Sequence, residues 1–386
     1  MLRGIFGDKP WKQTVSYSFC RGTASWESIA RTFKAIVREC TLIRLRVVAS
    51  VCDQGSTNVR AIKQLLFDTK RDCKSAEEGL IMIDEQKIVP LFDPPHLLKC
   101  IRNNLLTKDL RYTLDGVERT AKWSHFEDTY FIDRCRGDFR TLVNITEQHV
   151  VSSRIKKMRV KYCTQVFSRK VASLMELMST TEAESACKSR KMSASGIDTA
   201  LLFLNLNSLF DSVNSRAILD NESNATDIWN KCINLFQSMR FIKRKARDKE
   251  YPAALQNWIH TLKGFKILKS YLLDLGFAGF RTRDFNQDPL ENFFSLVRQH
   301  GGRNTNPTCS VFTGYYKSLL INSLFSNSGR QNCEADCSEN LLNVKEILIQ
   351  TCLSLSVERL PFRASQSVFD RQLCRSCIKE MYFFHQ

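Results

Sequence analysis

The stretch LRVVASVC (Leu45–Cys52), followed directly by DQGSTN, decides how the rest of this sequence is interpreted. It is a β-branched apolar run of the kind found in a strand buried inside a parallel sheet. Asp53 ends the run, Gln-Gly-Ser follows, and a helical pattern begins at about Asn58. Because open α/β sheets bind ligands at the carboxyl ends of their strands, Asp53 is a candidate for chemistry.

The neighbouring segments extend this pattern in both directions. Upstream, Trp11–Cys20 alternates as a strand does, and Ser25 can cap the helix that follows. Downstream, Lys87–Phe92 is a second buried strand, which ends in Asp93 before a helix that reaches about Leu106. Strands and helices that alternate with short links predict an α/β sheet.

A second acidic stretch, QDPLENFFSLVRQHGG (Gln287–Gly302), is predicted to be a helix. Asp288 and Pro289 suit its N-terminus, and apolar residues then recur at helical spacing. Asp288 and Glu291 are three residues apart and therefore share one face of the first turn. From spacing alone, the two carboxylates are either a capping arrangement or ligands for a cation.

The middle of the chain differs from both ends. From about Lys122, strand signals disappear and helical patterns run to about Leu275; Asn205–Asn214 presents a polar face there. The region from Pro307 onward is again mostly helical. We therefore predict an α/β plus α fold, in which a large all-helical insertion interrupts the α/β domain. The expected domains are residues 1–118, 119–276, 277–325 and a helical tail at 326–386.

Size and charge limit the kind of protein this is. The 386 residues suffice for two or three domains, and 43% hydrophobic and 25% charged residues are ordinary for a soluble globular chain. The net charge of +17 favours polyanions such as DNA, RNA or nucleotides, although an inert basic surface is the alternative. Basic residues concentrate in Arg154–Lys161 and Met239–Lys249.

Other sequence signals are weak or missing. No apolar run is long enough for a membrane span, the first residues show no secretory signal, and the odd number of scattered cysteines favours reduced intracellular thiols. The usual glycine-rich nucleotide loops are absent. The pairs Cys333/Cys337 and Cys374/Cys377 are either four zinc ligands or incidental cysteines.

Five blocks, in order, resemble the P-element transposases and the related THAP-type transposases. They are VCDQGSTN (Val51–Asn58), LFDPPHLLKCIRNN (Leu91–Asn104), KKMRVKYCTQVFS (Lys156–Ser168), LFDSVNSR (Leu209–Arg216) and QDPLENFFSLVRQHGGRNTNPT (Gln287–Thr308). The resemblance implies an RNase H-like catalytic domain, split by a helical GTP-binding insertion. It also implies nuclear, Mg²⁺-dependent, cut-and-paste transposition of DNA.

The resemblance assigns catalytic roles to two of the acids. Asp53 matches the second carboxylate of the family's three-acid set and Glu291 the third, so both are expected Mg²⁺ ligands. The first acid belongs on a strand upstream of Trp11. We therefore expect this chain to lack the family's first two strands, zinc finger and oligomerising helix, and to be catalytically impaired. Asp93 is either the cap of the following helix or a metal ligand that substitutes for the missing first acid.

The resemblance also implies a GTP site in the insertion. Lysines would neutralise the phosphates, and an Asp carboxylate would accept hydrogen bonds from guanine. The alternative is that LFDSVN is an ordinary amphipathic helix. The matched positions are Lys157, Lys170 and Val171 for the phosphates, Phe210, Asp211 and Asn214 for the guanine, and Asp288 closing the site.

Three functions remain open at this stage. The leading one is a P-element-like transposase fragment that binds DNA and GTP, either alone or as a homo-oligomer. The second is a domesticated nucleic-acid- or protein-binding module without catalysis. The third is an intact nuclease that uses Asp53, Asp93 and Glu291. Beyond Glu291, Arg298, His300 and Arg303 either meet a DNA phosphate or are simply solvated.

Overall fold

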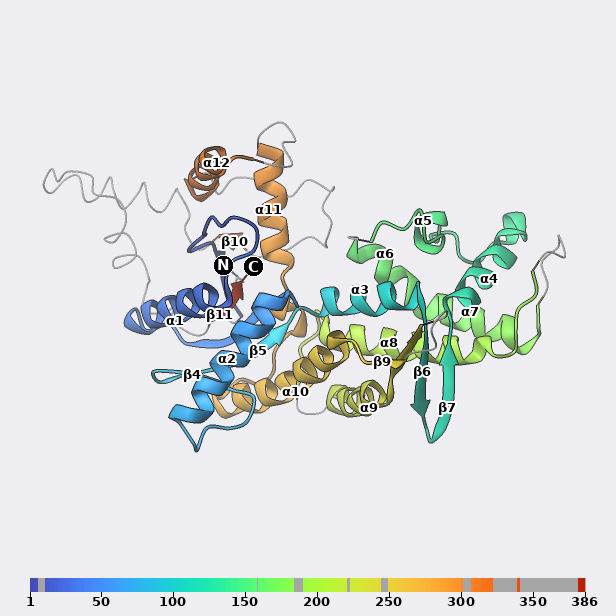
Figure 1. Cartoon of the computed structure of the whole chain (residues 1–386), viewed down its shortest axis with the longest axis horizontal. Helices are drawn as coiled ribbons and strands as arrows, with labels where there is room; N and C mark the ends of the chain where they lie inside the picture. Colours follow the sequence, from blue (N-terminus) through green and yellow to red (C-terminus); the bar gives the residue numbers. More distant parts are fainter. Residues whose placement is uncertain are drawn as a thin grey trace, which may run out of the picture. The chain divides into compact units, whose positions relative to one another are not determined.

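The computed structural model describes the chain except residues 6–10, 158, 184–189, 221–222, 244–248, 301–306, 322–338, 341–380 and 386. It divides into two compact units. Unit 1 combines residues 1–91 with 287–386, and unit 2 is the continuous stretch 92–286. Unit 2 therefore spans residues 92–286, and the helical insertion that the sequence predicts at 119–276 lies within it. The predicted boundary at 118 falls inside strand β7 (Val117–Ala121) (Figure 1).

Unit 1 is built on a seven-stranded sheet in the order β10-β2-β1-β11-β3-β5-β4. Helices α1 and α2 lie side by side (Figure 1). The elements of unit 1 are β1 (Leu2–Gly4), β2 (Trp11–Gln13), α1 (Trp26–Leu42), β3 (Val47–Cys52), α2 (Ser56–Asp72), β4 (Ile81–Ile83), β5 (Gln86–Phe92, whose last residue is assigned to unit 2), α11 (Asp288–His300), α12 (Cys309–Ile321), β10 (Glu339–Asn340) and β11 (Met381–His385).

The amino-terminal strands differ from the prediction. The expected strand Trp11–Cys20 is limited to Trp11–Gln13, and residues 14–20 take no regular structure. A further strand, β1, precedes it and pairs antiparallel with β2. The backbone of β11 lies between β1 and β3, antiparallel to the first and parallel to the second. The sheet therefore continues beyond β3 on this side through β11, β1, β2 and β10.

The centre of unit 1 forms as the sequence predicts. All six residues of β3 are buried, as expected for an apolar β-branched run between two neighbouring strands. The Ser25 side chain caps α1 by accepting from the Ser28 amide. Buried Gln86 ties β5 to β3, because its Oε1 accepts from Val47 N and its Nε2 donates to Leu45 O. These contacts fix the strand that ends at Asp53.

Unit 2 contains a sheet as well as helices, so the structure does not confirm an all-helical insertion. Four strands pair antiparallel in the order β7-β6-β8-β9. Asp115 and Gly116 turn the β6–β7 hairpin with positive φ angles of 52° and 78°, which is the Asp-Gly signature of a tight hairpin. The strands of this sheet are β6 (Lys108–Leu114), β7 (Val117–Ala121), β8 (Arg240–Lys243) and β9 (Lys249–Glu250).

The helices of unit 2 enclose a core that includes the fully buried Trp123, Trp229 and Trp258. Helices α7 and α8 pack along each other and carry the polar face considered below (Figure 1). Within the described residues, no helix has the length and apolar character that a membrane crossing requires. The helices are α3 (Pro94–Leu105), α4 (Trp123–Arg134), η1 (Gly137–Phe139), α5 (Glu147–Val150), α6 (Val160–Val166), α7 (Arg169–Thr180), α8 (Gly196–Val213), α9 (Ala225–Ser238), α10 (Ala253–Asp274) and η2 (Thr282–Phe285).

Candidate functional site

Asp53 lies directly after β3 and is half-buried. Its Oδ1 accepts two hydrogen bonds, one from Gly55 N at 2.8 Å and one from Asn58 Nδ2 at 2.7 Å. Both bonds hold the carboxylate in one orientation at the end of the strand. Beside it, Asn58 Oδ1 is buried and accepts no hydrogen bond from the described residues. Oxygen atoms of this kind are what Mg²⁺ prefers as ligands.

Asp93 is the N-cap of α3. Its carboxylate accepts from His96 N at 3.0 Å and lies 2.6 Å from His96 Nδ1, while only 1% of the residue is exposed. The capping interpretation is therefore confirmed. Asp93 belongs to unit 2, whereas Asp53 belongs to unit 1.

Helix α11 carries both acids that the sequence places in its first turn. Asp288 is buried and Glu291 is half-buried, so the two carboxylates meet different surroundings despite their spacing. The described residues hold no group of three or more His, Cys, Asp or Glu side chains gathered as metal ligands. Asp53 and Glu291 consequently remain a predicted pair of ligands in unit 1. The four cysteines considered for zinc, and Arg303, lie outside the described residues.

The face between α7 and α8 joins several residues that were predicted to bind GTP. Asn207 on α8 accepts from Arg169 N at 3.2 Å and donates to Asp211 Oδ2 at 2.7 Å. One amide therefore links the first turn of α7, where exposed Lys170 follows Arg169, to the carboxylate of Asp211. Partial burial of the carboxylate raises the pKa of Asp211, and the hydrogen bond from Asn207 opposes that rise.

The other predicted GTP contacts have different surroundings. Val171 is buried in the core, and its amide donates to the Ser168 cap of α7, so its side chain faces no ligand. Phe210 is half-buried on α8. Asn214 Oδ1 accepts from Asn286 Nδ2 at 3.1 Å, which ties the end of α8 to the segment after η2. Lys157 is exposed, and its carbonyl accepts from Arg102 of α3.

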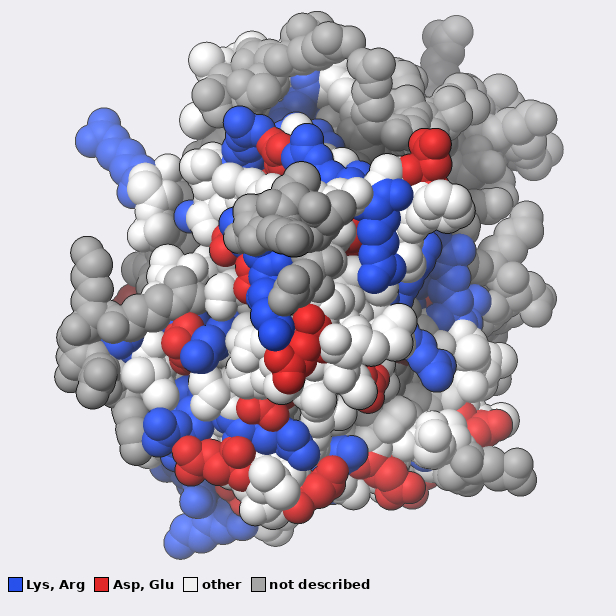
Figure 2. All heavy atoms as spheres, turned by 90° about the vertical axis from the view of Figure 1, so that its right-hand side faces the viewer, with Lys and Arg blue, Asp and Glu red and all other residues white. Residues whose placement is uncertain are grey.

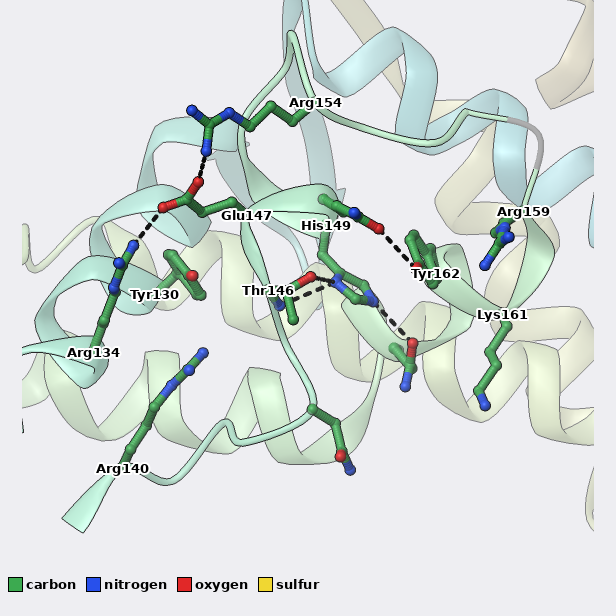
Figure 3. A pocket seen from close by; sticks show the side chains of 13 residues that line it. Tyr130, Arg134, Arg140, Thr146, Glu147, His149, Arg154, Arg159, Lys161 and Tyr162 are labelled. Atoms are coloured by element: carbon green, nitrogen blue, oxygen red, sulfur yellow. Dashed lines mark hydrogen bonds and ion pairs between the residues drawn. The ribbon is translucent and has the colours of Figure 1, made fainter. Parts of the chain in front are cut away.

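A basic cavity of about 750 Å³ opens elsewhere in unit 2 (Figure 3). Sequence reasoning had singled out only part of its lining, the basic run Arg154–Lys161. Arg134 at the end of α4 and Arg140 after η1 complete the cationic wall. These two residues lie on a separate segment with no continuous basic run, so the sequence alone gave no reason to join them to the first.

His149 lines this cavity and is held as a neutral imidazole. Its Nδ1 accepts from Thr146 N at 3.1 Å, so Nε2 carries the proton and donates to Gln165 Oε1 at 2.9 Å. Burial lowers the pKa of His149 below its ordinary value of 6.5, and the bond to Gln165 opposes that effect. The ring also stacks on Tyr162, with centroids 4.2 Å apart.

We expect acid to destabilise unit 2 through His149 and through His125. Burial lowers the pKa of His125, and the charge of neighbouring Lys122 lowers it further. The unfolded chain takes up protons as pH falls through about 6.5, while the folded imidazoles resist them, so stability present above that pH is lost below it. We expect the free energy of unfolding, measured with urea, to fall from about pH 7.5 to about pH 5.5. His149→Gln should flatten this fall, whereas His300→Gln, at an exposed position, should leave it unchanged.

Comparisons with known families agree with this arrangement. Three family models match the chain in order: the TNP-like RNase H N-terminal domain over residues 1–66, the TNP-like GTP-binding insertion domain over 95–226, and the TNP-like RNase H C-terminal domain over 284–317. They define the class of protein: an RNase H-like domain interrupted by an insertion of the GTP-binding kind. The insertion model begins within three residues of the start of unit 2.

The relatives narrow the class. The chain is 25% identical over 353 residues to the transposable element P transposase of Drosophila melanogaster, an alignment that covers 89% of this chain but only 44% of that protein. The solved Drosophila P element transposase strand transfer complex shares the fold, with a TM-score of 0.63 and 21% identity over 83% of this chain and 69% of that one. This chain belongs to the P-element transposase-like family, and it spans less than half the length of the curated relative.

Proposed function

We propose that this chain is the core of a P-element-like DNA transposase, in which unit 2 binds GTP and unit 1 carries Mg²⁺-dependent strand chemistry. The observation that carries the proposal is the hydrogen-bonded link between the first turn of α7 and Asp211 on α8. It joins a cationic helix start to a carboxylate within the stretch that matches the GTP-binding insertion model. We further propose that the chain acts on DNA in the nucleus, alone or as a homo-oligomer.

The α7–α8 face fits a guanine nucleotide in its chemistry. The positive end of the α7 dipole and the Lys170 ammonium favour phosphate groups. An ionised Asp211 can accept from the N1–H and the exocyclic amine of guanine, which adenine does not present together. Asn207 holds the Asp211 carboxylate in place for this role. Lys157, in unit 2, and Asp288, in unit 1, remain proposed nucleotide contacts that rest on the family resemblance alone.

Asp53 and Glu291 are the residues that would hold Mg²⁺ in unit 1. When bound, Mg²⁺ activates an attacking water or 3′-hydroxyl and stabilises the leaving oxygen. The protein's part is to fix the ligands. Gly55 N and Asn58 Nδ2 hold Oδ1 of Asp53, and α11 presents Glu291 from its first turn. Asp93 is left out of this set because its carboxylate caps α3.

Asp211→Ala should weaken GTP binding by about 10-fold or more, because charge-assisted hydrogen bonds are worth about 1.5–3 kcal/mol. Calorimetric titration of the full chain with GTP and with ATP measures this. The preference for GTP over ATP should shrink in the variant, because the lost contacts are to the base. Asp274→Ala removes an exposed carboxylate from the end of α10 and serves as the charge-matched control. Equal GTP affinity in wild type and Asp211→Ala would remove the proposed site.

A further inference from the structure

The basic cavity of unit 2 gathers more positive charge than it neutralises. Five cationic side chains and a single carboxylate, that of Glu147, are among the described residues that line it. On the face shown in Figure 2, Lys and Arg occur in separate groups with Asp and Glu between them, so the basic residues of that face do not form one continuous patch. The cationic residues of the cavity are Arg134, Arg140, Arg154, Arg159 and Lys161.

Internal ion pairs neutralise only part of this charge. Glu147 contacts both Arg134, at 2.5 Å, and Arg154, so one carboxylate serves two guanidinium groups (Figure 3). Buried Asp133 forms a further ion pair with Arg140 at 3.6 Å. Within the described residues, Arg159 and Lys161 form no ion pair, and both are exposed. His149 adds no charge at neutral pH, since burial lowers its pKa. The cavity therefore offers cations to an anionic ligand.

Buried groups hold part of the cavity wall in a fixed position. Asp133, fully buried behind the wall, accepts from the backbone amides of Thr141 and Leu142 at 2.8 Å each. This fixes the chain where Arg140 projects over the ring of Tyr130, with its guanidinium carbon 5.1 Å from the ring centroid. Anchored cations lose less conformational freedom when they bind a ligand than free surface lysines do.

Apart from exposed Asn144, the aromatic and amide side chains of the cavity already have partners within the protein. Figure 3 shows Tyr162 between His149, which stacks on it, and Arg159, whose guanidinium carbon lies 5.5 Å from its ring centroid. The Tyr162 hydroxyl donates to Gln148 Oε1, and His149 Nε2 donates to Gln165 Oε1. No ring face of Tyr162 is left on which a base could stack. The cavity is therefore equipped to contact phosphates, which carry charge, and not to read bases.

From this geometry we propose that the basic cavity binds the phosphodiester backbone of a nucleic acid strand, without regard to its sequence. The site is distinct from the α7–α8 face and does not rest on GTP binding there. Phosphate contacts of this kind position a protein along a strand and make its affinity depend on salt. Arg159 and Lys161 would make these contacts most directly, because neither has a carboxylate partner among the described residues.

The test compares the double variant Arg159→Gln/Lys161→Gln with wild type, both as the full chain. Fluorescence anisotropy of labelled duplex DNA is recorded over a series of KCl concentrations, on two unrelated sequences. Each lost phosphate contact should reduce the slope of log affinity against log salt by about 0.9, so we expect a flattening of about 1 to 2 and weaker binding, equal on both sequences. Lys231→Gln/Lys263→Gln removes two exposed lysines from α9 and α10 and should change neither quantity.

Several outcomes would overturn the proposal. One is an unchanged slope in the double variant; another is a loss confined to one sequence, which would indicate base reading. A third is that the double variant loses the binding of sodium tripolyphosphate measured by calorimetry but keeps the wild-type salt slope for DNA. The cavity would then bind a small free anion and not a nucleic acid strand. Thermal melting checks the fold, and Lys161→Glu alone, at an exposed position, repeats the test if the double variant unfolds. Asp211→Ala should leave the DNA slope unchanged, which separates this site from the nucleotide site.

Discussion

Replacing Asp133 by Asn should lower the free energy of unfolding of unit 2 by about 3 kcal/mol. Both carboxylate oxygens accept backbone hydrogen bonds, from Thr141 N and from Leu142 N, and the side chain is fully buried. An Asn amide would place a second donor against one of these N–H groups. It would also remove the negative charge that lies 3.6 Å from Arg140 Nε.

Urea unfolding followed by tryptophan fluorescence measures this loss, because Trp123, Trp229 and Trp258 all lie in unit 2. Asp128→Asn is the matched control on the same helix: Asp128 pairs with Arg190 at 2.6 Å but is partly exposed, so its loss should cost less than about 1 kcal/mol. If the two variants unfold at the same urea concentration, Asp133 does not anchor the loop. The basic cavity would then also lose its proposed support.

Asp53→Asn should reduce Mg²⁺-dependent cleavage of DNA by at least about 100-fold, which is the effect expected when a metal site loses a charged ligand. The substitution is well suited to the question. Asn Oδ1 can still accept from Gly55 N and Asn58 Nδ2, so the fold around β3 is retained and only the charge is removed. A nicking assay with the full chain, with Mg²⁺ and with EDTA, gives the rate.

The control for Asp53 is Asp84→Asn, an exposed acid of unit 1 at a positive φ of 53° that Asn also tolerates. Cleavage should be unchanged in that variant. Equal rates for Asp53→Asn and wild type would contradict the role assigned to Asp53. Wild type that binds DNA but shows no metal-dependent cleavage would favour the alternative of a non-catalytic binding module.

Local signals predicted the parts of the fold that depend on neighbouring residues. The buried strand before Asp53 follows from a β-branched apolar run, and the caps at Ser25 and Asp93 follow from residue type next to a helical pattern. The β6–β7 hairpin was missed although Asp115-Gly116 marks its turn and apolar residues alternate with polar ones along β6, because its partner strand β7 is short and largely polar. The four-stranded sheet of unit 2 was missed with it.

Pairings between distant segments could not be predicted in this way. Strand β1 is only three residues long, and its pairing with β11 joins the two ends of the sequence, which no local pattern reveals. The basic cavity is similar: the run Arg154–Lys161 is visible in the sequence, but Arg134 and Arg140 meet it only through folding. The link from Arg169 to Asp211 through Asn207 likewise depends on how α7 and α8 pack.

The interruption of unit 1 by unit 2 has a consequence for biosynthesis. Unit 2 is continuous, so it can fold on the ribosome while the second half of unit 1 is still being made. The first half of unit 1 must meanwhile wait, because β1 and β3 receive β11 between them only after residue 381 has emerged. Pairings of such sequence separation form slowly, and the waiting strand edges are open to other chains. Chaperones that shield residues 1–91 during synthesis should therefore raise the yield of folded protein more than any stabilisation of unit 2.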